Sequence, residues 1–292
     1  MTMMVEQPLP TLEAWVDYFS AVEIPVLRQT SCRLEEAGQD IDRINGRKIA
    51  AIVLQDPLLA VRVLAYIQSF HGKHLRSDIT TVANAIMMLG VDPFFRHFKS
   101  VTTIESMLRT EPQAMLGVLH VIRRAQRASR YAYEWALERY DINVEEVALA
   151  ALLHDLAEIL LWCFAPRLAI EIRSRQRIDK ALRSATAQEQ VLGICLFDLQ
   201  RALCDAWHLP ELLNSLMDDA RAEHARVRNV VLAVNLARHS ANGWNDPALP
   251  DDFSAIESLL HIDRRTLLTR LSLPDDVAQK YLIHSGNSVE HM

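Results

Sequence analysis

The stretch ALLHDLAEILL, residues 151–161, decides the fold and raises the question of function. His154 and Asp155 stand side by side in a run that is otherwise almost wholly apolar. Burying an ionisable pair is costly unless another group compensates it. A metal, a protein counter-charge or a solvent-filled cleft could do so. Which of the three is present decides whether this chain is an enzyme.

The apolar run around this pair is long enough to suggest a membrane span. It covers residues 147–164, but it contains His154, Asp155 and Glu158. Three ionisable groups favour a buried helix of a soluble protein. Asn143 with Glu146 resembles a capping box at the start of this helix, and Pro166 marks its end. The pattern therefore predicts one core helix from Asn143 to Pro166 that carries the His-Asp pair.

Helix signals recur along the rest of the chain. Thr11 and the pairs Asp56-Pro57 and Asp92-Pro93 have the residue types of helix starts. Eight glycines in 292 residues are few, and strand-rich proteins need glycine in tight turns. The sequence thus predicts an all-α protein, with a linker at residues 242–252 and further helices at residues 113–140, 187–207, 210–222, 226–241, 253–270 and 275–281.

Composition limits the setting in which the chain works. Half of the residues are hydrophobic and 23% are charged, so a sizeable core is expected. The net charge of −6 disfavours nucleic acid as the main partner. The four cysteines form no CxxC pair, which indicates reduced thiols and no zinc motif. The N-terminus lacks the pattern of a signal peptide. We expect a cytoplasmic protein with neither a membrane nor a nucleic acid as partner.

Five segments, in the correct order, resemble the signature of the HDOD domain, a relative of the HD phosphohydrolases found in bacterial signalling proteins. Gln68 stands where the signature usually has Asn. Together the segments cover roughly Ile24 to Gly243: Ile24-Pro25, Gln55–Ser69 (QDPLLAVRVLAYIQS), Ile79–Gly90 (ITTVANAIMMLG), Leu149–Leu161 (LAALLHDLAEILL) and Ala206–Pro210 (AWHLP).

The resemblance implies a multi-helix HDOD-type array with an N-terminal helical bundle and a C-terminal HD-like helical bundle. The divisions that follow are an N-terminal helix at residues 1–23, the N-terminal helical part at 24–111, the HD-like part at 112–243, and a linker with closing helices at 244–292.

The resemblance also implies a ligand set for a catalytic metal, most of which this chain lacks. The upstream His falls at Arg123 or Arg124, and a later His falls at Leu196. A His pair falls near Met217–Asp219, and the last Asp falls near Arg238. His154 and Asp155 alone remain, and two ligands do not hold a catalytic cation tightly. We therefore expect a relic motif and no metal; a metal, if bound, would use His154 and Asp155.

Arginine at the lost positions suggests what compensates the buried carboxylate. A guanidinium is always charged and pairs well with carboxylates. We hypothesise that Arg238, Arg123 or Arg124 pairs with Asp155, while His154 donates to a neighbouring backbone or carboxylate group. Arg123, Arg124, Arg127 and Arg130 also form a stripe at helical spacing. This stripe is either an anion site for a nucleotide or phosphate, or a solvated surface.

These observations predict a non-catalytic signal-transduction module that acts by binding. Its expected partner is a protein of a signalling pathway, with a small anionic nucleotide as a further ligand, and no cofactor is expected. The alternative is a metal-dependent HD-type phosphohydrolase acting on a nucleotide or cyclic dinucleotide. The missing His positions distinguish the two functions.

Overall fold

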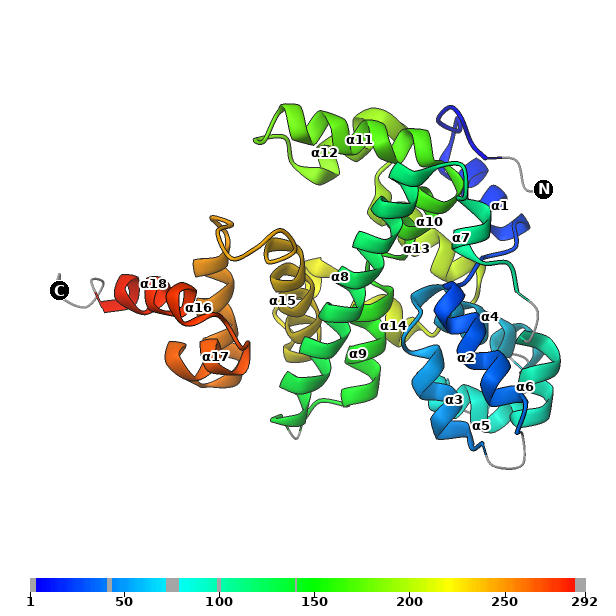
Figure 1. Ribbon diagram of the computed structural model, residues 1–292, viewed down its shortest axis with the longest axis horizontal. Helices are drawn as coiled ribbons and strands as arrows, with labels where there is room; N and C mark the ends of the chain where they lie inside the picture. The colour runs from blue at the N-terminus through cyan, green and yellow to red at the C-terminus, as the bar shows by residue number, and fades with distance from the viewer. Residues whose placement is uncertain (1–3, 41–43, 72–78, 99–100, 140, 287–292) are drawn as a thin grey trace. The chain divides into compact units, whose positions relative to one another are not determined.

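Helices make up nearly all of the regular structure. A computed structural model describes residues 4–40, 44–71, 79–98, 101–139 and 141–286. Within these ranges the regular elements are α-helices and one short 3-10 turn, with an isolated bridge between Val26 and Thr103 (Figure 1). The predicted all-α fold class is confirmed.

The chain divides into two compact units. Unit 1 comprises residues 1–126 and 152–214, and unit 2 comprises residues 127–151 and 215–292. The chain passes between them inside three helices: α8 (Pro112–Leu137), α9 (Val144–Leu153) and α14 (Glu211–Leu216). This division differs from the boundaries expected from the motifs, because a continuous helix can contribute its two ends to different cores.

Unit 1 holds the N-terminal helices and the segment after the His-Asp pair. Besides the first part of α8, the end of α9 and most of α14 (Glu211–Leu216), its helices are α1 (Leu12–Ala21), α2 (Arg28–Gly38), α3 (Gly46–Val53), α4 (Pro57–His71), α5 (Val82–Leu89), α6 (Val91–Phe98), α7 (Ile104–Met107), α10 (Leu156–Phe164), α11 (Pro166–Ile178), α12 (Ser184–Leu192) and α13 (Leu196–Ala206).

Helix α10 lies in the core of unit 1. All of its residues except Glu158 are buried. Phe164 meets Phe19 of α1 edge to face at 6.0 Å between ring centroids. On another side α8 approaches closely at Gly117, where an added Cβ would lie 2.4 Å from the ring of Trp162. A larger residue at position 117 would therefore push the two helices apart.

Unit 2 is a smaller helical group around α15. Besides its parts of α8, α9 and α14, it contains the 3-10 turn Asp219–Arg221 and the helices α15 (Ala225–His239), α16 (Leu249–Leu260), α17 (Arg264–Arg270) and α18 (Asp275–Gly286). Helices α15 and α16 pack together, and His239 Nδ1 lies 2.6 Å from the buried carboxylate of Asp252.

Three of the predicted helix starts are confirmed. The Thr11 hydroxyl accepts the Ala14 N–H, and Asn143 accepts the N–H groups of Glu145 and Glu146. Asp56 is fully buried and accepts the N–H groups of Leu58 and Leu59 at the start of α4. Each is a polar side chain that satisfies donors left free by the first helical turn.

Several predicted helices differ from those observed. Asp92 lies inside the first turn of α6, which begins at Val91, so it does not precede the helix. The predicted helix 187–207 is two helices, because Gly193 turns the chain at a φ of +72°. Likewise His261, at a φ of +54°, separates α16 from α17. Helix α16 begins at Leu249, which shortens the predicted linker.

One segment of the described residues meets the length and composition of a membrane span. It covers Val144–Phe164, which comprises α9, α10 and the turn between them, and 83% of its most apolar window is buried inside the fold. Core helices of globular proteins meet the same criterion, and the burial of this segment is of that kind.

Candidate functional site

The His-Asp pair lies at a break between two helices. Helix α9 ends at Leu153 and α10 begins at Leu156, so His154 and Asp155 form the turn between them. The prediction of one continuous helix from Asn143 to Pro166 is therefore wrong. The residues on both sides of the pair keep an apolar helical pattern, so the sequence gives no sign of the break beyond the pair itself.

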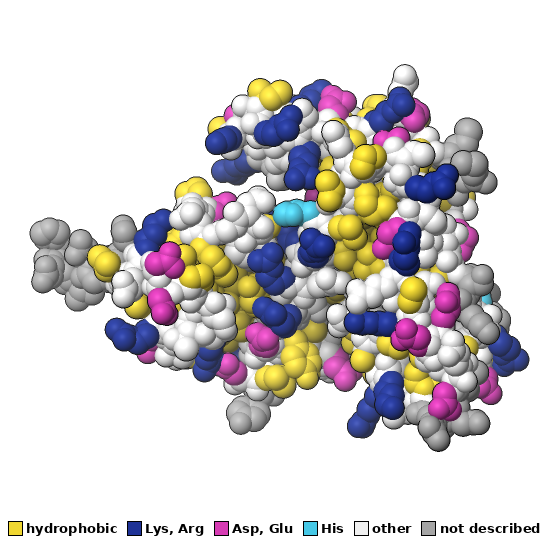
Figure 2. Space-filling model, viewed as in Figure 1, with side chains coloured by type: hydrophobic (Ala, Val, Ile, Leu, Met, Phe, Trp, Pro, Cys, Tyr) yellow, Lys and Arg dark blue, Asp and Glu magenta, His cyan; other side chains and the backbone are white. Residues whose placement is uncertain are grey.

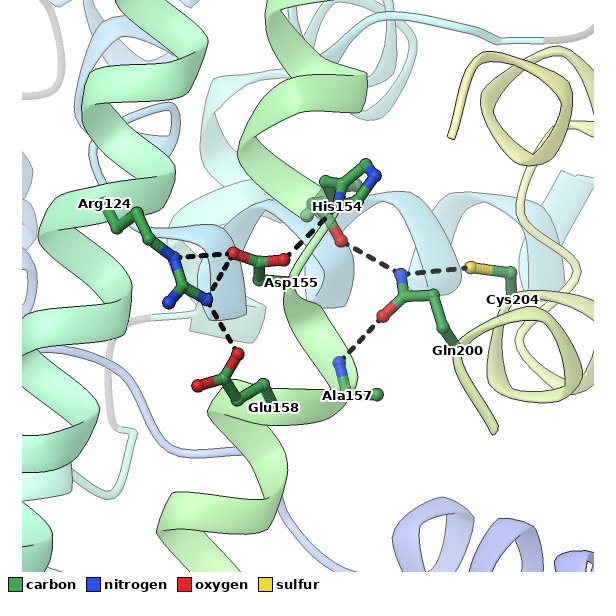
Figure 3. A network of polar contacts seen from close by, with 8 residues as sticks. Arg124, His154, Asp155, Ala157, Glu158, Gln200 and Cys204 are labelled. Carbon is green, nitrogen blue, oxygen red and sulfur yellow. Dashed lines mark hydrogen bonds and ion pairs between the residues drawn. The ribbon is translucent and has the colours of Figure 1, made fainter. Parts of the chain in front are cut away.

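Gln200 of α13 accounts for the break. In a continuous helix, the Ala157 N–H would donate to the Leu153 carbonyl four residues earlier. Here the Gln200 Oε1 accepts the Ala157 N–H at 2.8 Å, and the Gln200 Nε2 donates to the Leu153 carbonyl at 2.9 Å (Figure 3). The side-chain amide thus takes the place of one backbone hydrogen bond, a known cause of helix distortion. We call this pair of bonds the Gln200 bridge.

Arg124 of α8 supplies the positive charge beside Asp155. Its Nε and one terminal nitrogen both donate to Asp155 Oδ2, at 2.9 and 2.5 Å. The same terminal nitrogen donates to Glu158 Oε2 at 2.7 Å (Figure 3). The side chains of Arg124 and Asp155 are only 11% and 10% exposed, so solvent screens this ion pair weakly.

The protonation of Arg124 follows from these contacts. Burial disfavours the charged guanidinium, but the carboxylates of Asp155 and Glu158 outweigh it, so the pKa of Arg124 lies above its ordinary value. The cation is therefore permanent at every pH at which the protein folds. An internal positive charge of this kind offsets the cost of burying two carboxylates.

His154 contacts the other oxygen of the same carboxylate. Its Nδ1 lies 3.2 Å from Asp155 Oδ1, and it donates there in the tautomer that carries the proton on Nδ1. The Asp155 oxygens thus face the imidazole on one side and the guanidinium on the other (Figure 3). A catalytic metal of the HD type would need those oxygens as ligands. The Arg124 guanidinium, 2.5 Å from Asp155 Oδ2, repels a second cation at that oxygen. This group of side chains therefore does not fit such a metal.

The other predicted site residues come from α8, from α15 and from the segment between α14 and the 3-10 turn. Arg123 is exposed on α8, and Arg238 is half-buried in the last turn of α15 in unit 2. Asp218 accepts the Ala220 N–H at the start of the 3-10 turn, the bonding of a helix terminus. Within the described ranges, no group of three or more His, Cys, Asp or Glu side chains has an arrangement that could hold a metal.

The arginines of the stripe on α8 have different bonding partners. Arg124 is used by Asp155 and Glu158, whereas Arg130 pairs with Glu134 one helical turn later, at 3.6 Å. Arg127 lies 3.3 Å from the Ser240 hydroxyl in unit 2.

Sequence reasoning did not identify Gln200 as part of the site. Its bonding partners lie 43 and 47 residues away, and local periodicity carries no signal of them.

The chain is thus an all-α protein with a His-Asp turn between α9 and α10. The family model of the HDOD domain matches residues 24–223. The chain belongs to the HDOD domain family. A comparison with curated protein sequences finds no significant match.

Solved structures that resemble this fold include two bacterial proteins. One is a virulence factor of Campylobacter jejuni, 18% identical, with a TM-score of 0.65 over 93% of this chain and 100% of that chain. The other is the MmoQ response regulator of Methylococcus capsulatus, 16% identical, with a TM-score of 0.58 over 90% of this chain and 98% of that chain. At these identities the likeness concerns the fold alone.

Proposed function

We propose that this chain is a non-catalytic regulatory module that transmits a signal by binding a partner protein. The observation that carries the proposal is the ion pair between Arg124 and Asp155. In an HD hydrolase the carboxylate of the motif is a metal ligand, and here its lone pairs accept hydrogen bonds from a permanent cation and an imidazole. The same atoms that would support hydrolysis serve to join α8, α10 and the turn between α9 and α10.

The setting we propose is the cytoplasm, within a signalling pathway. The four cysteines are free thiols, as in a reducing compartment. Burial raises the pKa of the Cys204 thiol to about 12, with a further contribution from Asp205 opposed by the Gln200 hydrogen bond. Cys204 therefore stays a neutral, unreactive side chain. A small anionic nucleotide is a second ligand class, because Arg123, the neighbour of Arg124 in α8, is an exposed cation.

Metal analysis combined with an activity assay tests this proposal. The purified chain is incubated with manganese or iron, passed through a desalting column, and analysed for bound metal and for hydrolysis of nucleotides and cyclic dinucleotides. We expect substoichiometric metal and no turnover above that of the His154→Ala variant. Full metal occupancy together with turnover that His154→Ala abolishes would establish the phosphohydrolase instead.

A thermal-shift measurement separates the two ligand classes. A ligand that binds the folded state raises the unfolding temperature by mass action. If a nucleotide is the ligand, a panel of nucleotides contains at least one that raises the unfolding temperature in a concentration-dependent way. If the module binds protein alone, as we propose, none does.

A further inference from the structure

Four exposed cations and one exposed apolar side chain lie in the segment where α11 ends and α12 begins. The cations are Arg173, Arg177, Lys180 and Arg183, and the apolar residue is Ile178, which is 82% exposed. We call these five residues the basic tip. Figure 2 shows dark blue side chains gathered over α11 and α12 in unit 1.

The basic tip has a charge opposite to that of the whole protein. Residues 173–183 contain five cationic side chains and one acid, Asp179, in a chain with a net charge of −6. Arg175 is neutralised by Glu171 at 2.6 Å. Within the part of the chain that the structure describes, the four cations of the basic tip form no ion pair with an acidic side chain. Their charge is therefore available to another molecule.

The arrangement is unfavourable for the isolated fold. Arg173 and Arg177 are four residues apart on one exposed helix face, a spacing at which like charges repel. Ile178 exposes most of its side chain to water at the same place. The helix dipole favours Arg177 in the last turn of α11, so the local cost comes from Arg173 and Ile178. Such local costs are expected at functional sites.

Hydrogen bonds hold the turn that carries the basic tip. Asp179 accepts the Ala181 N–H at 2.9 Å, and Gln176 donates to the Ser184 hydroxyl at 2.8 Å, which joins α11 to α12. The two helices also pack against each other (Figure 1). The cations are thus presented on an ordered support, and such preorganisation reduces the entropy lost on binding.

We propose that the basic tip is a docking surface for an acidic segment of a partner protein, with an apolar side chain of that segment covering Ile178. The inference rests on the proposed binding function and names the chemistry of its partner. Three of the four free cations are Arg, whose planar guanidinium matches a carboxylate through two hydrogen bonds. Arg is enriched and Lys depleted at protein interfaces. A single Ile offers little apolar area for insertion into a membrane.

Selection from a displayed library of random peptides, with the full chain as bait, tests the proposal. We expect the enriched peptides to combine several Asp or Glu residues with one large apolar residue, and their binding to weaken as salt is added. The double variant Arg173→Glu/Arg177→Glu should reduce their affinity by about tenfold or more. Arg177→Lys should cause a smaller loss because it keeps the charge and removes the planar fork.

A matched variant controls for a general effect of charge. Arg47 and Lys48 are exposed cations of α3 in the same unit, and the variant Arg47→Glu/Lys48→Glu should leave peptide affinity unchanged. Circular dichroism verifies that both double variants fold.

Three results would overturn the inference. They are enrichment of peptides without acidic residues, equal loss of affinity in both double variants, and binding to phosphatidylserine vesicles through Arg173 and Arg177 without binding to acidic peptides. None of these results changes metal content or hydrolysis. Failure of the docking surface is therefore distinguishable from failure of the proposed function.

Discussion

Two buried carboxylates of unit 1 are satisfied in different ways. Asp56 is fully buried, and its oxygens accept backbone N–H groups: those of Leu58 and Leu59 in its own helix start, and that of Leu27 at 2.7 Å. Asp155 accepts from side chains, above all from Arg124 at 2.5 Å. Backbone donors hold a carboxylate in a fixed structural place, whereas a charged side chain can take the place of a metal.

The two carboxylates therefore differ in what their removal leaves behind. Without Asp56, neutral backbone donors lose their acceptors. Without Arg124, two negative charges remain in a partly buried site. The second situation costs more, because an unpaired buried charge is more expensive than an unpaired dipole.

Arg124→Ala has the largest expected effect. The substitution leaves Asp155 and Glu158 without their cation, and we expect the free energy of unfolding to fall by about 3–5 kcal/mol. Chemical denaturation measures this change. Arg123→Ala, at the exposed neighbouring position, should alter the free energy of unfolding by less than about 0.5 kcal/mol. Equal effects of the two variants would contradict the assigned role of Arg124.

Asp56→Ala ranks second. It removes a helix cap, worth about 1 kcal/mol, and leaves the buried Leu27 N–H without an acceptor, worth about 1–3 kcal/mol more. Asp92→Ala is the matched control, because Asp92 also precedes a proline but is exposed and caps nothing. Its expected loss is about 0.5 kcal/mol, from the helix dipole alone. An equal loss of unfolding free energy in Asp92→Ala and Asp56→Ala would show that the burial of Asp56 does not set the size of its effect.

Gln200→Leu has a smaller effect on stability but a larger effect on the site. The freed Ala157 N–H and Leu153 carbonyl can bond to each other, which makes α9 and α10 continuous. We expect a loss of about 1–2 kcal/mol from desolvation and imperfect repacking. In a crystal structure of the variant, Asp155 should move away from Arg124. An unchanged turn would show that Gln200 does not cause the break. Gln190→Leu, at an exposed position of α12, is the control.

The smallest effect concerns pH. Burial raises the pKa of Asp56 above its ordinary value, against the opposing hydrogen bonds of Leu27, Leu59, Thr30 and Leu58. The folded state then holds its proton to higher pH than the unfolded state does. The stability that Asp56 contributes falls as pH rises from about 4, the ordinary carboxyl value, through the raised pKa.

Comparison with Asp56→Asn isolates this effect. Asn does not ionise, so the contribution of residue 56 to the free energy of unfolding does not change with pH in this variant. The difference in unfolding free energy between wild type and variant should therefore shrink as pH rises above about 4. A difference that grows with pH would mean that the N–H bonds lower the pKa of Asp56 below its ordinary value.

The same contrast explains how far the sequence predicts the structure. The cap at Asp56 was predictable, because two of its partners are the next residues of its own helix. The sequence predicts that an arginine pairs with Asp155, but it does not choose among Arg238, Arg123 and Arg124. Arg123 and Arg124 are neighbours in sequence, and burial alone distinguishes them. The Gln200 bridge was not predictable, because the apolar pattern of residues 147–164 gives no indication that a distant amide enters the backbone ladder.

Crystals soaked in manganese, with diffraction recorded near the manganese absorption edge, test whether Arg124 takes the place of a metal beside Asp155. We expect the guanidinium of Arg124 within hydrogen-bonding distance of Asp155 and no anomalous peak beside that carboxylate. A strong anomalous peak at coordination distance from both His154 and Asp155, with Arg124 displaced, would contradict it.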